Sequence, residues 1–409
     1  MKRATHILTA LVLSLLPLAA TAQQSSCENS SCAAIERIYR DGRYFVLEII
    51  GSVPAQPKLA AETDAGWIKV LGGKQGDKIW FKVNKRVRAN SEADARRYFE
   101  AIRFRAYTSG GTAVLRGEPS QAGHNAMLEM EIQTPRNLDY AKASTRGGSV
   151  GVYNISGKAY AESMGGSVSM NDIGGTAVAS TMGGSIDVDK IGGDAKLETA
   201  GGSVNIGTVG GQIVAETAGG SIRVAQGKSN VSVETAGGSI SVGDCAGTLK
   251  ATTAGGSIDV GRVGAGAHLE TAGGSIRLTS AGDVVKAVTS GGGIRLSRLP
   301  KGVYAETEAG GIEAEFVAKR GDFTDSKLIT NSGDIVVYLP SDLGVTVRAT
   351  IEVSNGHRVI SDFDEVKITN DNDGYGPRTV YGNGAINGGG PVLKLNTSNG
   401  NIYLRRTRR

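Results

Sequence analysis

Apolar and polar residues alternate along the middle of the chain in short runs that glycine pairs separate. In Gly201–Val209, Val204 and Ile206 are apolar and Asn205 between them is polar, and Gly210–Ala218 repeats this pattern. Side chains alternate between the two faces of a strand, so a period of two predicts a strand with one face inward. Each pair of nonapeptides therefore predicts two short strands.

This pair of nonapeptides recurs every 18 residues between about residues 137 and 316. The serine after each glycine pair marks the period: Ser149, Ser167, Ser185, Ser203, Ser221, Ser239, Ser257 and Ser275, with Gly293 and Gly311 continuing the step. No unit contains a segment of helix length, so successive units must stack strand on strand in parallel. The sequence predicts an all-β fold, a single-chain parallel β-solenoid. We expect it to be right-handed and, with about ten coils, roughly 50 Å long.

The corners between strands carry the residues that persist from coil to coil. We expect the glycine pairs to adopt positive φ there, which other residues resist. A threonine stands near the second corner of most coils, and stacked hydroxyls can hydrogen-bond along the ladder, whichever way they point. Glu198, Glu216 and Glu234 precede this threonine. Their stacked carboxylates repel one another unless counter-ions are present, and they are our candidate surface contacts.

The regions on either side of the array lack its period. We divide the chain into a signal peptide (1–22), an N-terminal α+β cap region (23–133), the solenoid array (134–316) and a C-terminal β cap (317–409). Atypical ends stop a solenoid from associating edge to edge. In the first cap, Arg43–Ile50 predicts a strand. Ser91 predicts the N-cap of a helix with Ala95, Phe99 and Ile102 inward.

In the second cap, the period breaks at Lys319–Ser326, which predicts an insertion. Asn331–Ile335 and Thr397–Ile402 are degenerate copies of the corner motif, and Asn370–Gly390 is rich in glycine, asparagine and aspartate, which predicts a loop.

The first 22 residues predict export. Lys2 and Arg3 precede an apolar run from Ile7 to Ala20, and Ala20-Thr21-Ala22 has the pattern of a cleavage site. We expect a mature chain in the periplasm, on the outer surface or secreted, without a transmembrane segment. Cleavage lowers the net charge from +5 to +3, because 43 basic residues then face 40 acidic ones. This mild charge does not indicate a nucleic-acid partner.

The three cysteines have two different predicted roles. Cys27 and Cys32 are four residues apart and predict a disulfide in an oxidising compartment. A metal site at this pair would need further ligands, and no His or other Cys lies near it in the sequence. Cys245 occupies a position that is apolar in other coils, which predicts a buried free thiol.

Several motifs together resemble a known family. They are Gly66–Val70, Lys78–Val83, the helix at Ser91–Asp94, Thr134–Leu138, the Gly-Gly-Ser-Ile/Val ladder and Thr397–Ile402. In this order they are similar to the DUF4097 family of exported bacterial β-helical, adhesin-like proteins. The resemblance covers most of the mature chain. It implies the solenoid fold and a role at the cell envelope, and it offers no catalytic residues.

Nonapeptides at two per coil also invite comparison with calcium-binding β-rolls. Those repeats carry Gly and Asp at positions four and six, where this chain has apolar core residues such as Val204 and Ile206. The carboxylates that would bind calcium are absent from these positions. The glycine pairs recur without a following helix, which also excludes a phosphate-binding loop. Single threonines beside glutamate do not form the Thr-x-Thr columns of an ice-binding face.

One group of aspartates is a candidate for catalysis. Asp187 and Asp189 are two residues apart on an outward face, with Asp172 and Asp194 near in sequence, and paired carboxylates can cleave polysaccharides. No tyrosine or arginine column accompanies them, and outward aspartates are typical of a solvated strand. His124, His268 and His357 stand in unrelated contexts, without a nucleophile elbow or a zinc-binding pair.

The sequence thus predicts a non-enzymatic, exported structural or adhesin-like protein that presents a rigid solenoid to a surface polymer, glycan or protein. We expect no cofactor and no metal. One alternative is a carbohydrate-active enzyme, a lyase or hydrolase, on the same scaffold. The other is a periplasmic scaffold associated with the envelope.

Overall fold

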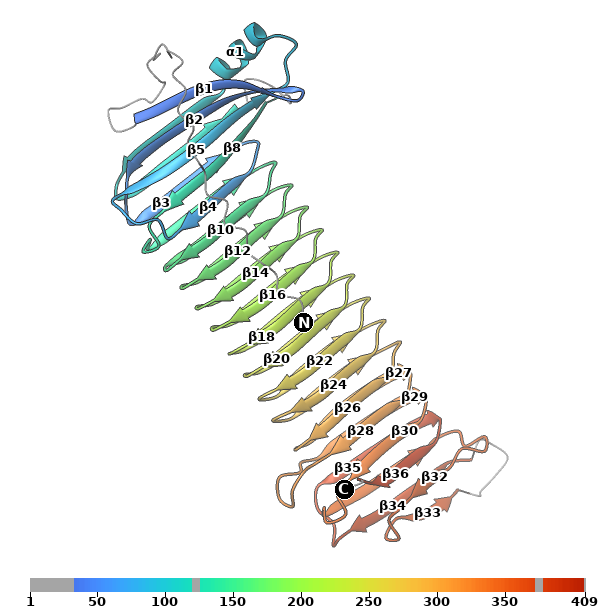
Figure 1. Ribbon diagram of the computed structural model, residues 1–409. Helices are drawn as coiled ribbons and strands as arrows, with labels where there is room; N and C mark the ends of the chain where they lie inside the picture. Colours follow the sequence, from blue (N-terminus) through green and yellow to red (C-terminus); the bar gives the residue numbers. More distant parts are fainter. Residues whose placement is uncertain (1–32, 120–125, 372–377, 408–409) are drawn as a thin grey trace, which may run out of the picture.

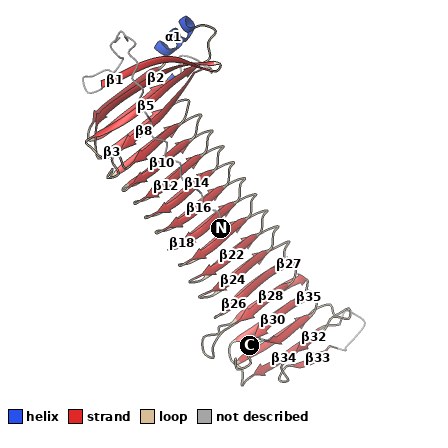
Figure 2. Cartoon of the chain, viewed as in Figure 1, coloured by secondary structure: helices blue, strands red, loops and turns tan. Residues whose placement is uncertain are grey.

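The computed structural model describes residues 33–119, 126–371 and 378–407, and they form a rod of stacked strands (Figure 1). Two long sheets, here called sheet A and sheet B, run the length of the rod, each with eighteen strands of the described chain. One helix lies at the N-terminal end of the rod (Figure 2). The prediction of an all-β parallel solenoid is confirmed.

The array alternates between the two sheets, so that each coil gives one strand to each. In sheet A the strands are β10 (Val150–Ile155), β12 (Val168–Ile173), β14 (Ile186–Ile191), β16 (Val204–Val209), β18 (Ile222–Gly227), β20 (Ile240–Cys245), β22 (Ile258–Val263), β24 (Ile276–Ala281), β26 (Ile294–Leu299) and β28 (Ile312–Phe316). In sheet B they are β9 (Tyr140–Thr145), β11 (Lys158–Ser163), β13 (Ala177–Thr181), β15 (Ala195–Thr199), β17 (Ile213–Thr217), β19 (Val231–Thr235), β21 (Leu249–Thr253), β23 (Ala267–Thr271), β25 (Val285–Thr289) and β27 (Val303–Ala309).

Pairing between neighbouring coils is parallel and in register. Val204 pairs with Ile222, and Ile222 pairs with Ile240, which is the 18-residue step read from the sequence. The inward side chains on both sheets are almost fully buried, as the alternation predicts. Each apolar side chain therefore contacts its counterparts above and below, and the core is one continuous column between the sheets.

The glycine pairs do not have the positive φ that we expected from the sequence. Among the described glycines with positive φ, none belongs to the Gly-Gly-Ser motifs between residues 165 and 292. Close approach of stacked backbones explains the glycine instead. A Cβ on Gly220 would lie 2.1 Å from the Gly202 carbonyl oxygen of the previous coil, whereas one on Gly219 would lie 3.2 Å from the nearest atom. The second glycine of each Gly-Gly-Ser motif is thus required by space.

The threonine column points inward, which the sequence left open. Thr217, Thr235 and Thr253 are buried. The hydroxyl of Thr235 donates to the Gly220 oxygen of the previous coil at 2.7 Å and accepts from the Gly238 N–H at 3.3 Å. The same pair of bonds recurs from coil to coil. Each threonine therefore satisfies polar groups of the corner that would otherwise be unpaired.

The N-terminal end begins with an antiparallel sheet that continues sheet A. Its strands are β1 (Ala33–Asp41), β2 (Tyr44–Pro54), β5 (Lys78–Val87) and β8 (Ala126–Thr134). The predicted strand Arg43–Ile50 lies almost entirely in β2. Helix α1 (Glu92–Ala101) starts after Ser91, whose side chain accepts from the Asp94 N–H. Its buried residues Ala95 and Phe99, with Ile102 after it, confirm the predicted inward face. The hairpin of β6 (Arg103–Ser109) and β7 (Thr112–Glu118) continues sheet B.

The first coil lies inside the region that we predicted to be a cap. Strand β3 (Lys58–Thr63) pairs in parallel with β9, and β4 (Ile68–Gly72) pairs in parallel with β10. Thr63 pairs with Thr145 in this register. The predicted boundary at residue 134 therefore falls between two stacked coils. On the other side of this first coil, β7 pairs in parallel with β3 and β8 pairs in parallel with β4, so the segment from β5 to β8 extends the ladder beyond it.

At the C-terminal end, spatial order differs from chain order. The remaining strands are β29 (Ser326–Ser332), β30 (Ile335–Leu339), β31 (Val345–Ile351), β32 (Val359–Ser361), β33 (Lys367–Asn370), β34 (Val380–Ile386), β35 (Val392–Asn399) and β36 (Ile402–Arg406). The last coil, β35 and β36, lies between the coil of β29 and β30 and the strands β31 and β32. The two degenerate corner motifs therefore stack directly on each other.

Two further predictions concern this end. The insertion near Lys319–Ser326 is confirmed, because the connection between β28 and β29 is longer than in other coils and Phe323 in it packs on Phe316. The predicted loop Asn370–Gly390 is wrong in part, because β34 runs through it antiparallel to β31. Gly384 is needed there for space, since a Cβ would lie 2.3 Å from the Glu365 oxygen.

Several predictions fall on residues that the structure does not describe. The signal peptide, Cys27, Cys32 and His124 lie outside the described ranges. Cys245 is a buried free cysteine, as predicted, and burial raises the pKa of its thiol. In the described part of the chain, no helix is long and apolar enough to cross a membrane.

Candidate functional site

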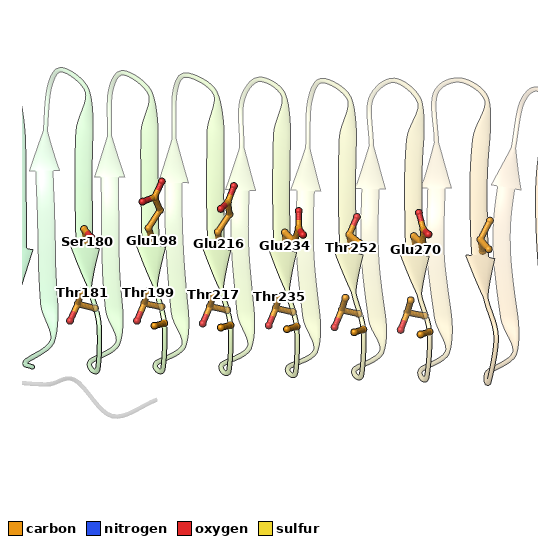
Figure 3. Close-up of a pocket in the computed structure, with 18 of the residues that line it drawn as sticks. Ser180, Thr181, Glu198, Thr199, Glu216, Thr217, Glu234, Thr235, Thr252 and Glu270 are labelled. Atoms are coloured by element: carbon orange, nitrogen blue, oxygen red, sulfur yellow. The ribbon is translucent and has the colours of Figure 1, made fainter. Parts of the chain in front are cut away.

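The three predicted glutamates line one groove on the outside of sheet B. It has a volume of about 810 Å³ and follows the rod across successive coils. Glu198, Glu216 and Glu234 stand in register, one coil apart, and Figure 3 shows their side chains in a single row beside the threonine row. The groove is lined by Ser180, Thr181, Glu198, Thr199, Ala200, Glu216, Thr217, Ala218, Glu234, Thr235, Ala236, Thr252, Thr253, Ala254, Glu270, Thr271, Ala272, Val288 and Ser290.

Strand parity and the small corner residues form this groove. In β15, β17, β19 and β23 the glutamate precedes the inward threonine at the end of the strand, so its side chain must point outward. An exposed alanine follows the threonine, as in Ala218 and Ala236, before the chain turns at the glycine pair. The short alanine side chains leave open space beside the longer glutamates.

Charge is distributed unevenly along the row. At its ends, Lys196 Nζ lies 2.8 Å from a Glu198 carboxylate oxygen, and His268 Nε2 lies 3.4 Å from Glu270. The hydrogen bond to Glu198 raises the pKa of Lys196, and the charge of Glu216 adds to this. Among the described residues, the carboxylates of Glu216 and Glu234 have no ion-pair or hydrogen-bond partner. The middle of the groove thus carries two stacked, exposed carboxylates on neighbouring strands, whose backbones are about 4.8 Å apart.

The sequence predicted three of the four glutamates in this row. Glu270 occupies the same repeat position and lines the same groove, one coil beyond Thr252. Its Glu-Thr-Ala-Gly-Gly-Ser-Ile context was the signal that could have included it. The flanking cations Lys196 and His268 stand on the neighbouring outward position of their strands, which drifts from coil to coil and gives no signal in the sequence.

Of the four aspartates considered for catalysis, Asp187 and Asp189 line one hollow on sheet A. One tyrosine and one arginine, Tyr153 and Arg223, line it too, although neither belongs to a column of its kind. The other two aspartates have partners of their own. Asp172 pairs with Arg136 at 2.8 Å, and an Asp194 oxygen accepts from the Gln212 N–H at 2.8 Å. Asp187 accepts from Asn205 Nδ2 at 2.7 Å. His268 is outward as predicted, and His357 contacts Asn399 at the C-terminal end. Within the described ranges, no three His, Cys, Asp or Glu side chains are grouped as a metal site requires.

Two solved structures are similar to this chain. One is a Bacteroides fragilis protein described as a putative adhesin, 16% identical, covering 56% of this chain and 96% of its own, with a TM-score of 0.30. The other is a Clostridium sporogenes protein described as a putative cell adhesion protein, 10% identical, covering 88% and 99%, with a TM-score of 0.14. At these TM-scores neither similarity carries an argument about function.

No protein-family model matches the chain, and no curated protein matches it. Membership of the DUF4097 family therefore stays a prediction from the sequence motifs.

Proposed function

We propose that the chain is an exported, non-enzymatic structural protein of the adhesin-like type. Its rod binds an extended surface polymer or protein lengthwise in the groove of Glu198, Glu216, Glu234 and Glu270. The observation that supports this most directly is the groove itself, which follows the coil axis and carries unpaired carboxylates in its middle. Export by residues 1–22, to the periplasm or beyond it, is part of the same proposal.

The carboxylates favour a partner that supplies hydrogen-bond donors or positive charge. Two exposed carboxylates one coil apart repel each other by about 1 kcal/mol in water. A ligand ammonium or guanidinium group between them would remove this repulsion and gain attraction to both. Binding should therefore weaken as salt concentration rises.

The test measures binding of the mature chain to whole cells and to a glycan and polycation array. We expect the double substitution Glu216→Gln and Glu234→Gln to lower binding and its salt dependence. The matched control is Asp244→Asn with Asp259→Asn, which removes the same charge on sheet A, where these aspartates pair with Arg262 and Arg277. Equal binding by the two double variants would contradict the role of the groove, and no binding by the wild-type chain would contradict the proposed function.

The enzymatic alternative has a separate test. Incubation with acidic and neutral polysaccharides should release no new reducing ends or unsaturated products. Reproducible turnover that Asp187→Ala abolishes would overturn the non-enzymatic proposal. An envelope scaffold, the remaining alternative, would bind proteins of the envelope rather than external polymers, which pull-down from purified envelope fractions would show.

A further inference from the structure

Sheet A carries a half-buried tyrosine ring, Tyr153, on its outward face, away from the glutamate groove. Gly151 occupies an outward position of β10 and is nevertheless buried, because the ring of Tyr153 lies across it. A Cβ on Gly151 would lie 2.6 Å from Tyr153 Cε2. Lys69 Nζ from the neighbouring coil is 6.0 Å from the ring centroid. Glycine and lysine together hold the tyrosine ring against the sheet.

Polar side chains continue from this ring along two neighbouring columns. Asn171 and Asp189 follow Tyr153 in register on the next two coils. Beside them, Asp187, Asn205 and Arg223 are in register on three successive coils. These residues line a hollow of about 390 Å³, within the size range of ligand sites.

The hollow forms because the side chains in the column that begins with Tyr153 become small. After Asp189 the same position is Gly207 and then Ala225. The Asp189 carboxylate lies over Gly207, since a Cβ there would be 1.9 Å from Asp189 Oδ1. From Tyr153 to Arg223 the site crosses four coil steps, roughly 19 Å at the usual strand spacing. That length suits a short stretch of an extended chain.

Several polar groups around the hollow lack partners. Asn205 Nδ2 donates to one oxygen of Asp187. Among the described residues, the other Asp187 oxygen, the Asp189 carboxylate and the Arg223 guanidinium make no hydrogen bond or ion pair. Asn171 Oδ1 is buried without a partner. The site thus offers both acceptors and donors next to an aromatic face.

This combination fits the chemistry of a sugar chain. A sugar ring has an apolar face that can stack on an aromatic ring, and hydroxyls that donate to carboxylates and accept from guanidinium and amide groups. An anionic polymer would meet repulsion from Asp187 and Asp189. An apolar peptide would leave the carboxylates and Arg223 desolvated and unpaired.

We propose that this face of sheet A binds a neutral saccharide chain. One sugar stacks on Tyr153, and the hydroxyls of the following sugars bind Asp189, Asn205 and Arg223. The inference rests on the proposed function, a rod that binds a surface polymer, and it adds a ligand class and a second binding face.

The test is isothermal titration of the mature chain with cellohexaose, laminarihexaose, xylohexaose and maltohexaose. We expect at least one to bind, and Tyr153→Ala to weaken that binding about tenfold, while Tyr153→Phe retains it. Gly151→Ala keeps the tyrosine but displaces its ring, and it should also weaken binding. The matched control is Tyr304→Ala on sheet B, whose ring contacts Lys327. A thermal melt of each variant confirms that it is folded.

Two outcomes would overturn the inference: no binding of any of the four oligosaccharides, or wild-type affinity in Tyr153→Ala. Both are distinguishable from failure of the proposed function. If either outcome occurs while the wild-type chain binds whole cells and Glu216→Gln with Glu234→Gln does not, the saccharide site is wrong and the groove stands. If the wild-type chain binds neither cells nor arrayed polymers, the proposed function itself fails.

Discussion

The repeat array and the C-terminal end of the rod build the same coil from different parts of the chain. In the array, the Thr217 hydroxyl donates to the Gly202 oxygen at 2.8 Å, fifteen residues earlier. At the C-terminal end, Thr397 makes the same bond to Gly333 at 3.0 Å, 64 residues earlier. The inward threonine and the close-packed glycine are therefore common to the coils of both regions. In the array the 18-residue repeat places them, whereas at the C-terminal end they come from segments far apart in the sequence.

The ends also differ from the array in how they present their edges. The array strands are paired on both sides, whereas sheet A finishes at the three-residue β32 and sheet B at the four-residue β33. Short, antiparallel or charged edges discourage pairing with another chain. The inserted last coil thus lies in the interior of the ladder, and weaker strands occupy the exposed end.

The largest expected effect comes from a charge placed in either core. Ile240 in the array and Ile402 in the inserted coil are both fully buried. Aspartate at either position would be an unpaired buried charge, and we expect a loss of about 3–5 kcal/mol of stability. Chemical denaturation measures it, with the outward Ser241→Asp as control. If Ile402→Asp melted like the wild type, the inserted coil would not be part of the core.

Much of this comparison could be predicted from the sequence, and part of it could not. Period-two alternation fixes which residues face inward, so the array core and the outward direction of Glu216 follow from parity. The first coil was missed because β5 to β8 separate it from the array, although Leu59 and Thr63 occupy core positions of the repeat. The C-terminal order was missed because strand pairing between distant segments leaves no periodic signal.

The candidate site shows the same limit. The sequence located Glu198, Glu216 and Glu234, because they recur at one repeat position. It could not show that the alanines beside them leave a groove. Nor could it show that Tyr153 lies across Gly151, because that contact depends on a side-chain conformation. Outward columns change from coil to coil, so their chemistry becomes visible only when the coils are stacked.

A smaller effect is expected at the close-packed glycines. Cβ atoms on Gly220 and Gly400 would lie 2.1 and 2.0 Å from carbonyl oxygens of the neighbouring coil. Alanine at either position must push stacked backbones apart, and we expect about 1–3 kcal/mol of destabilisation. Gly219→Ala, in the same corner as Gly220, is the matched control and should change the melting transition little. Equal effects at Gly219 and Gly220 would mean that conformation rather than space selects the glycines.

Removing the threonine hydroxyl should have a similar but more modest effect in the two regions. Thr217→Val and Thr397→Val keep the side-chain shape and leave the carbonyl oxygens of Gly202 and Gly333 without their donor. Each should lower stability by about 1–2 kcal/mol. The comparison is measured by denaturant titration of both variants beside Thr252→Val, which changes an outward hydroxyl of the same strand type. A loss at Thr217 alone would show that the inserted coil does not depend on this bond.

The smallest expected effect is a pH dependence of stability that arises in the N-terminal end and not in the array. Lys85 in β5 is the one charged residue among the described residues that is buried. Its Nζ donates a hydrogen bond to the Phe99 carbonyl oxygen at 3.0 Å. Burial lowers the pKa of Lys85 from its ordinary value of 10.5, although the charge of Glu36 opposes this. Between the lowered pKa of Lys85 in the folded protein and its ordinary pKa in the unfolded chain, the unfolded chain binds more protons. Stability therefore rises with pH in this alkaline window.

Lys85→Met should remove that rise. Lys82→Met, on the same strand, should not remove it, because Lys82 is an exposed lysine paired with Glu48. The measurement is denaturant titration across the alkaline range. An unchanged slope in Lys85→Met would mean that Lys85 is hydrated in the folded protein, and the N-terminal end would then resemble the array in burying no charge.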